Sequence, residues 1–153
     1  MLFRSLSGGT LGTGGFSDTV GVLTLSSSST VDLGSGTSIL NFANSSGATW
    51  VNGSTLYVAN WNGSWSGGGG DQLIFGSTSL GLVQGQINNI IFVNPNGATG
   101  HFSSRILGSG EIVPVPEPAT IGFGSLLLGG LGFRERERLR RLIRAVCAKF
   151  ARA

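Results

Sequence analysis

The stretch VLTLSSSSTVDLGSGTSILNFANSSG, residues 22–47, determines the fold class of this chain. It contains three short runs that begin near residues 23, 31 and 39. In Leu23-Thr24-Leu25 and Val31-Asp32-Leu33 apolar and polar residues alternate. A period of two is typical of a β-strand that buries one face. Clusters of Gly, Ser and Asn, which favour turns, separate the runs. The stretch therefore predicts short strands joined by tight turns.

The same pattern continues on both sides of this stretch, through residue 112. No segment in this region has a sustained helical period, and residues 80–87 are long enough for one helical turn at most. Residues 1–112 are therefore predicted to be a β-rich region. The predicted strands cover residues 20–25, 30–33, 39–43, 55–59, 72–75, 89–93 and 102–107.

The spacing of these strands indicates how they are arranged. The first three starts are evenly spaced, and the later starts, near residues 55, 73 and 90, follow one another at roughly twice that spacing. The longer spacing approximates the coil length of a β-solenoid that begins with two shorter half-coils. The period is loose, so a β-sandwich stays open as the alternative. We expect a mainly β fold that is an irregular β-solenoid or a β-sandwich.

The composition agrees with this fold class and argues against an enzyme. Of the 153 residues, 67 are Gly, Ser, Thr or Asn, which favour turns and short strands over helix interiors. Hydrophobic residues make up 40% of the chain, which argues against wholesale disorder. One Cys and one His leave little for disulfides, metal binding or acid–base chemistry. We therefore expect no enzymatic activity, no metal site and no cofactor.

Charge divides the chain into zones. Residues 134–152 hold eight basic and two acidic side chains, a net charge of +6, whereas the residues before them hold two basic and five acidic side chains, a net charge of −3. The sequence pI of about 10.0 therefore belongs to a basic tail, residues 134–153. Between the β-rich region and this tail lie a proline-rich joint, residues 113–118, and an apolar stretch, residues 119–133.

The joint and the apolar stretch together predict a membrane segment. Val113-Pro114-Val115-Pro116-Glu117-Pro118 enforces an extended path, and we expect the folded region to end before it. The 15 uncharged residues that follow would span about 22 Å as a helix, short of the roughly 30 Å hydrocarbon core. The long side chains of Arg134 and Arg136 extend such a span. We expect a short transmembrane helix at residues 119–133, with a buried helix or strand of the domain as the alternative.

Residues 114–141 resemble the PEP-CTERM sorting signal of Gram-negative bacteria. The resemblance lies in the order of Val115-Pro116-Glu117-Pro118-Ala119-Thr120, a glycine-interrupted apolar stretch and an arginine cluster. Pro116, Glu117 and Pro118 match the sorting motif residue by residue. The apolar stretch and the arginine cluster match it in hydrophobicity and in charge. The resemblance implies export, transient retention in the inner membrane, and processing by an exosortase, a membrane transpeptidase. The basic cluster consists of Arg134, Arg136, Arg138, Arg140 and Arg141.

The β-rich region also resembles a known type of repeat. Residues 23–25, 29–34 and 38–43 are similar to the autotransporter-type β-helix repeats that often precede this signal. Residues 71–76 and 91–95 are similar to the closing segment of such proteins. The resemblance implies a solenoid and adds no activity.

The chain continues beyond the basic cluster, whereas the family usually stops shortly after it. Residues 139–150 have apolar residues at helical spacing and Arg or Lys on the remaining face. We expect a basic amphipathic helix on the lipids of the inner membrane, not a nucleic-acid ligand. Cys147 is interpreted as a small apolar residue of this helix. The positive-inside rule places the tail in the cytoplasm and the β-rich region in the periplasm.

Trp50, Trp61 and Trp65 are the aromatic candidates for a binding site. Their first interpretation is core or edge-covering packing, and the alternative is a stacking platform for sugar rings, with nearby Asn side chains bonding hydroxyls. His101 has no Cys or carboxylate at ligand spacing and is interpreted as a surface or partly packed residue.

Together these features predict an exported protein of the cell envelope or extracellular matrix with a structural, surface-presenting role. The alternative is a carbohydrate-binding or adhesive module. Expected partners are an exosortase-type membrane transpeptidase, inner-membrane lipids and an exopolysaccharide. The beginning of the chain lacks the long apolar run that a signal peptide needs, because Gly and Ser follow soon after Met1-Leu2-Phe3. We therefore expect a signal peptide and further β repeats to be encoded upstream of Met1.

Overall fold

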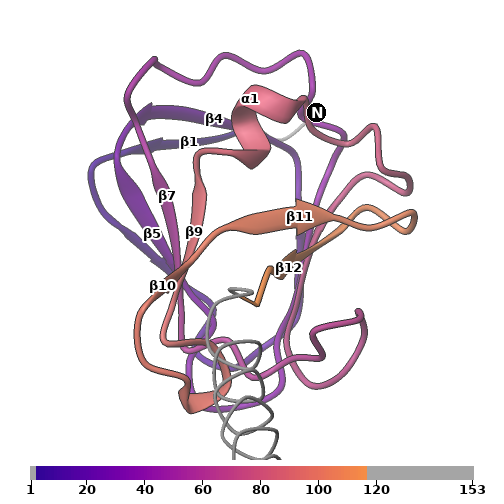
Figure 1. The fold of residues 1–153 in the computed structure, drawn as a ribbon. Coiled ribbons are helices and arrows are strands. Elements are labelled where there is room, and N and C mark those ends of the chain that lie inside the picture. The colour runs from indigo at the N-terminus through magenta and orange to yellow at the C-terminus, as the bar shows by residue number, and fades with distance from the viewer. Residues whose placement is uncertain (1–2, 117–153) are drawn as a thin grey trace, which may run out of the picture. The chain divides into compact units, whose positions relative to one another are not determined.

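The computed structural model describes residues 3–116, and within this part of the chain the fold is mainly β, as predicted (Figure 1). Its helices are α1 (Gln84–Ile87), which agrees with the single turn predicted at residues 80–87, and the short 3-10 turn η1 (Pro95–Gly97). The strands in chain order are β1 (Phe3–Ser7), β2 (Thr10–Gly12), β3 (Asp18–Val20), β4 (Val22–Ser27), β5 (Ser29–Asp32), β6 (Ile39–Phe42), β7 (Leu56–Ala59), β8 (Gln72–Phe75), β9 (Ile90–Val93), β10 (His101–Phe102), β11 (Ser104–Ile106) and β12 (Glu111–Pro114).

These strands form three sheets. Sheet 1 holds β1 and β4, sheet 2 has the order β10-β9-β7-β5-β2, and sheet 3 has the order β11-β12-β8-β6-β3. The chain visits the sheets in turn, so β1, β2 and β3 form one circuit and β4, β5 and β6 form the next. Each circuit lies parallel to the one before it, and Figure 1 shows β5, β7 and β9 side by side as a result.

Circuits become longer along the chain. In sheet 2, Thr10 pairs with Thr30, Ser29 pairs with Leu56, and Leu56 pairs with Ile90, so each pair of partners is farther apart in sequence than the pair before it. Every one of these separations exceeds the coil length predicted from the strand starts, and that prediction is wrong. Strands that follow one another in the chain, such as β4, β5 and β6, belong to three different sheets. Their spacing in the sequence therefore gives the distance from one sheet to the next and not the length of a full circuit.

The core lies between the three sheets. The register of the parallel strands places buried side chains of successive circuits next to one another. Val31 pairs with Val58 and Val58 with Phe92, and all three side chains are fully buried. In sheet 3, Phe42 pairs with Phe75, and their rings stack with centroids 4.9 Å apart. Each such side chain contributes about 1.5–3 kcal/mol through burial. Parallel register therefore turns the alternating pattern of each strand into a continuous apolar column.

The chain reverses direction after β9, which ends the parallel stacking. Strand β10 pairs antiparallel with β9, and β12 pairs antiparallel with both β8 and β11. All four residues of β12 are buried, including Val113 and Pro114. The sheet thus extends two residues into the stretch predicted to be a joint beyond the folded region. Pro114 is accommodated because β12 contacts β8 only through Glu111 and Ile112, so no backbone donor to β8 is needed at the proline.

Two other differences concern strand boundaries. Residues 20–25, predicted as one strand, are divided between β3 and β4 at Gly21, where the chain passes from sheet 3 to sheet 1. Residues 102–107 are divided between β10 and β11 at Ser103, where it passes from sheet 2 to sheet 3. An apolar run contains no signal for a change of sheet, so the sequence pattern predicts a single strand in each case.

Candidate functional site

The three tryptophans do not form one group. Trp61 and Trp65 meet edge to face with ring centroids 5.9 Å apart, and Trp61 meets Phe92 in the same way at 5.4 Å. Trp50 belongs to another side of the fold, where it forms a parallel bridge with Leu25 beside sheet 1. A stacking platform built from all three rings is therefore not present.

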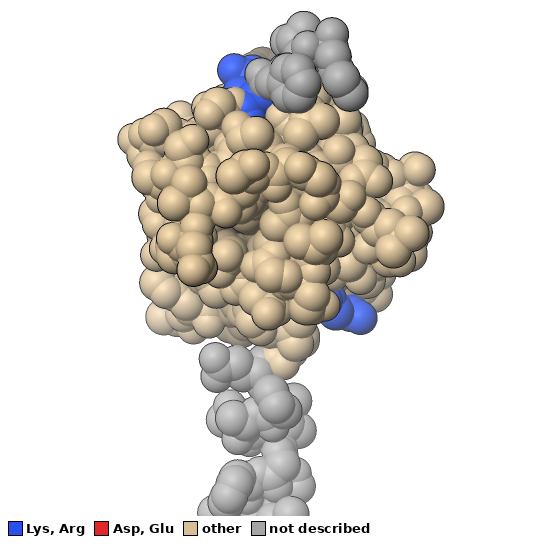
Figure 2. Space-filling model, turned by 90° about the horizontal axis from the view of Figure 1, so that it is seen from above, with Lys and Arg blue, Asp and Glu red and all other residues tan. Residues whose placement is uncertain are grey.

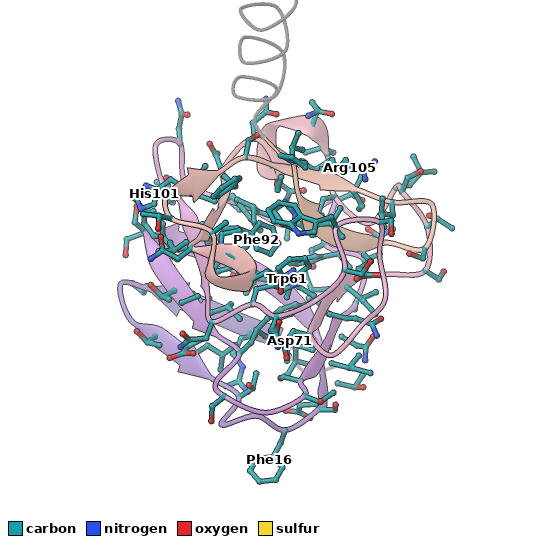
Figure 3. The ribbon with its side chains drawn as sticks, turned by 60° about the horizontal axis from the view of Figure 1, so that its bottom comes forward. Phe16, Trp61, Asp71, Phe92, His101 and Arg105 are labelled. Carbon is teal, nitrogen blue, oxygen red and sulfur yellow. The ribbon has the colours of Figure 1, made fainter. Side chains whose placement is uncertain are left out.

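Trp61 is part of the core. Its side chain is only 1% exposed, and Figure 3 shows it in the interior near Phe92. Trp65 is partly buried and also meets Phe102 of β10 edge to face, with centroids 5.7 Å apart. This aromatic row lies where the parallel circuits meet the antiparallel strands. The first interpretation, core and edge-covering packing, therefore describes Trp61 and Trp65.

The buried carboxylates bind backbone N–H groups. Asp71 is 1% exposed, and its Oδ1 accepts a hydrogen bond from the N–H of Ser38 at 2.9 Å, while its Oδ2 accepts one from Asn62 at 2.7 Å. Glu111 accepts the N–H of Gly68 with both oxygens, at 3.0 and 2.8 Å. The bonds of Asp71 join three loop segments, and those of Glu111 join the turn at Gly68 to β12. Both carboxylates thus have structural roles that the sequence pattern did not reveal.

Glu111 has a perturbed acidity. Burial raises the pKa of its carboxyl above the usual value of 4.5, and the hydrogen bond from Gly68 opposes this by lowering the pKa. The folded state therefore binds the Glu111 proton more readily than the unfolded state does.

We expect the contribution of Glu111 to stability to fall as pH rises from 4.5 through the raised pKa, because the charged form is the one that burial disfavours. The measurement is the free energy of unfolding of the native chain and of Glu111→Gln between pH 4.5 and pH 7. The native chain should lose stability relative to the variant over this interval. An unchanged difference between the two proteins would contradict the prediction.

Few charges mark the surface of the described region. Figure 2 shows a face on which basic residues lie only near the margins and no acidic residue is visible. His101 is exposed, at the margin in Figure 3, and its ring centroid lies 6.1 Å from that of Tyr57. Within residues 3–116 no three His, Cys, Asp or Glu residues are placed to hold a metal ion.

Two open clefts are large enough for a small ligand. The first, of about 460 Å³, is lined by Gly34, Ser35, Gly36, Asn60, Trp61, Asn62, Asp71, Asn94, Asn96 and Gly97. The second, of about 570 Å³, is lined by Ala48, Thr49, Trp50, Asn52, Val83, Gly85, Gln86, Asn88 and Asn89. Both are rich in side-chain amides, and only the second has a tryptophan that is not fully buried. Of the residues that line this second cleft, the sequence analysis named only Trp50 as a candidate for a binding site.

Of the predicted sorting motif, the structure describes only Pro116. This residue is exposed and follows Val115, whose N–H donates to the carbonyl of Ser103 at 2.9 Å. Glu117, Pro118, the apolar stretch 119–133 and the basic tail, including the cluster Arg134, Arg136, Arg138, Arg140 and Arg141, lie outside the described residues. Neither helix found between residues 3 and 116 has the length and apolar character to cross a membrane.

No known protein family, curated protein or solved structure matches this chain. The similarity of residues 114–141 to a sorting signal therefore remains a prediction from the residues themselves.

Proposed function

We propose that the chain is an exported, surface-presented structural protein whose β-rich region is the end of an irregular β-solenoid. A PEP-CTERM-type sorting signal follows this region. In this proposal residues 119–133 span the inner membrane, the basic tail lies on its cytoplasmic side, and an exosortase-type transpeptidase processes the chain. The β-rich region is periplasmic at first. It is then presented at the cell surface or in the extracellular matrix, in contact with exopolysaccharide.

The sheet topology supports the solenoid over the β-sandwich. Sandwiches are built from antiparallel strands, whereas β2, β5, β7 and β9 are all parallel and lie one circuit apart. The antiparallel strands β10 to β12 come last and cover one end of the stack. Terminal repeats of stacked architectures commonly differ from the internal ones in this way.

The observation that carries the functional proposal is the place where the compact fold ends. The first compact unit of the chain reaches Pro116, which is also the first residue of the Pro-Glu-Pro motif. Cleavage directly after the motif would leave every strand of the β-rich region in place. The hydrogen bonds from backbone N–H groups to Asp71 and Glu111 hold loops in place, as a protein with a rigid structural role requires.

Replacing Pro116, Glu117 and Pro118 by alanine should leave the chain uncleaved and bound to the inner membrane of a host that has an exosortase. All chains are expressed behind a signal peptide, and the native chain should be released in a shortened form that lacks the residues beyond the motif. Membrane and medium fractions are compared by immunoblot against an epitope placed between the signal peptide and residue 1 of every chain.

The matched control is Gly108→Ala with Ser109→Ala in the same epitope-tagged chain. Both residues are exposed, and a Cβ at Gly108 meets no atom within 4 Å. This control should be released like the native chain. Equal release of the triple alanine variant and the native chain would refute the sorting function.

A further inference from the structure

We propose that the second cleft, between Trp50 and α1, binds a neutral saccharide. This inference goes beyond the structural role proposed above and is independent of the sorting signal. It assigns the ring-stacking surface to Trp50 alone and the polar contacts to the amides of Asn52 and Asn89.

Trp50 is held rigidly at one wall of the cleft. Its indole Nε1 donates a hydrogen bond to the carbonyl of Leu23 at 3.2 Å. The backbone on each side of it is bonded to Leu25, since Leu25 N–H donates to Thr49 at 3.3 Å and Val51 N–H donates to Leu25 at 2.8 Å. The indole is only partly buried. A fixed aromatic face loses little entropy when a sugar ring stacks on it.

Gln86 of α1 also lines the cleft and is held in place by hydrogen bonds. This side chain is 5% exposed, and its Nε2 donates to the carbonyls of Ser45 and Ala48 at 2.9 and 3.1 Å. Its Oε1 accepts the N–H of Val83 at 2.9 Å. The helical turn is therefore tied to the loop that leads into Trp50. The cleft is formed before any ligand arrives, which is typical of small-molecule sites.

The polar groups of the cleft fit hydroxyl groups. Within residues 3–116 the side-chain amides of Asn52 and Asn89 make no hydrogen bond, and Asn88 uses only its Oδ1, which accepts from Gln84 at 2.8 Å. An amide offers both donors and an acceptor, as a pair of sugar hydroxyls requires. Val83, half exposed, adds an apolar contact. No charged side chain lines the cleft, so the ligand is a neutral sugar and not an acidic one.

The first cleft lacks these properties, although it holds more asparagines. Asn60 donates to Asp32 at 2.8 Å, Asn96 donates to the carbonyl of Gly63 at 2.8 Å, and Asn94 accepts from Gly100 at 2.8 Å. Its tryptophan, Trp61, is buried. Three of its four asparagines thus each make one hydrogen bond within the fold, as Asn88 does in the second cleft, and the side chain of Trp61 is only 1% exposed. The two clefts therefore differ in what they leave free for a ligand.

The test uses the full chain in detergent micelles, labelled with ¹⁵N at the tryptophan indoles. Three indole signals are expected, and each is assigned by its loss in a Trp→Phe variant. The probes are the neutral tetrasaccharides of glucose, mannose and N-acetylglucosamine, with tetragalacturonate as the acidic counterpart. At least one neutral probe should shift the Trp50 signal with a Kd of about 1 mM, typical of a shallow site, and leave the Trp61 signal in place.

The variant Asn52→Ala with Asn89→Ala should weaken binding of that probe about tenfold, because two hydrogen bonds are lost. The matched control is Asn62→Ala, an exposed asparagine of the first cleft, which should bind like the native chain. The indole signals of each variant in the absence of sugar report whether its fold is intact. The proposal is overturned if no neutral probe shifts the Trp50 signal, if tetragalacturonate binds equally well, or if the correctly folded double variant binds with native affinity.

Discussion

Replacing Gly81 by alanine is expected to lower the free energy of unfolding by at least about 3 kcal/mol, among the largest effects of any single methyl group in this chain. A Cβ at this position would overlap the backbone carbonyl of Phe75. The carbonyl cannot turn aside easily, because Phe75 ends β8 and its buried ring stacks on Phe42. Gly81 also accepts the N–H of Ser45 at 2.9 Å. Relief of the overlap therefore has to disturb the contact between two circuits.

The matched control is Gly85→Ala, measured in the same urea titration. Gly85 lies in α1, and a Cβ there meets no atom within 4 Å. Alanine in a helix is favoured over glycine by about 0.8–1 kcal/mol, so this variant should be unchanged or slightly more stable. If Gly81→Ala and Gly85→Ala have the same stability, the close contact between Gly81 and Phe75 is not part of the fold.

A second large effect is expected for Asp71→Ala, which should lower the free energy of unfolding by about 2–4 kcal/mol. The substitution removes the acceptor of two backbone N–H groups, and it leaves the buried N–H of Ser38 and the partly buried N–H of Asn62 without this partner. Because Ser38 precedes β6 and Asn62 follows β7, Asp71 joins segments from successive circuits. Figure 3 shows Asp71 inside the fold.

Two further variants separate the roles of shape and charge. Asp71→Asn keeps one acceptor and the side-chain volume, so its loss of stability should be smaller than that of Asp71→Ala. Asp18→Ala removes an exposed carboxylate that bonds only the N–H of the next residue, Thr19, and should change stability by less than about 0.5 kcal/mol. Chemical denaturation of all three variants provides the comparison, and a loss for Asp71→Ala as small as that for Asp18→Ala would contradict the bracing role.

The candidate site was only partly visible in the sequence. The three tryptophans and the abundant asparagines were evident, but the pattern grouped Trp50 with Trp61 and Trp65 because all three are close along the chain. Their separation follows from the circuits. Trp50 comes before β7, beside sheet 1, whereas Trp61 comes after β7 and turns into the core. Two residues that are close in the sequence therefore lie in different parts of the fold when a strand separates them.

The sequence by itself determined that residues 3–116 fold mainly into short strands, and it located those from β4 to β11, but it predicted no strand at β1, β2 or β12 and reached β3 only at Val20. Period-two alternation and clusters of Gly, Ser and Asn are local signals, and local signals suffice to start and end a strand. Only the tertiary structure decided which strands pair, that they pair in parallel through β9, and that Pro114 belongs to the last strand. Partners such as Leu56 and Ile90 lie far apart in the sequence, and the alternation is the same for parallel and antiparallel neighbours. The loops that return the chain to the same sheet vary in length, so the register depends on the packing of the whole core and not on any repeat in the chain.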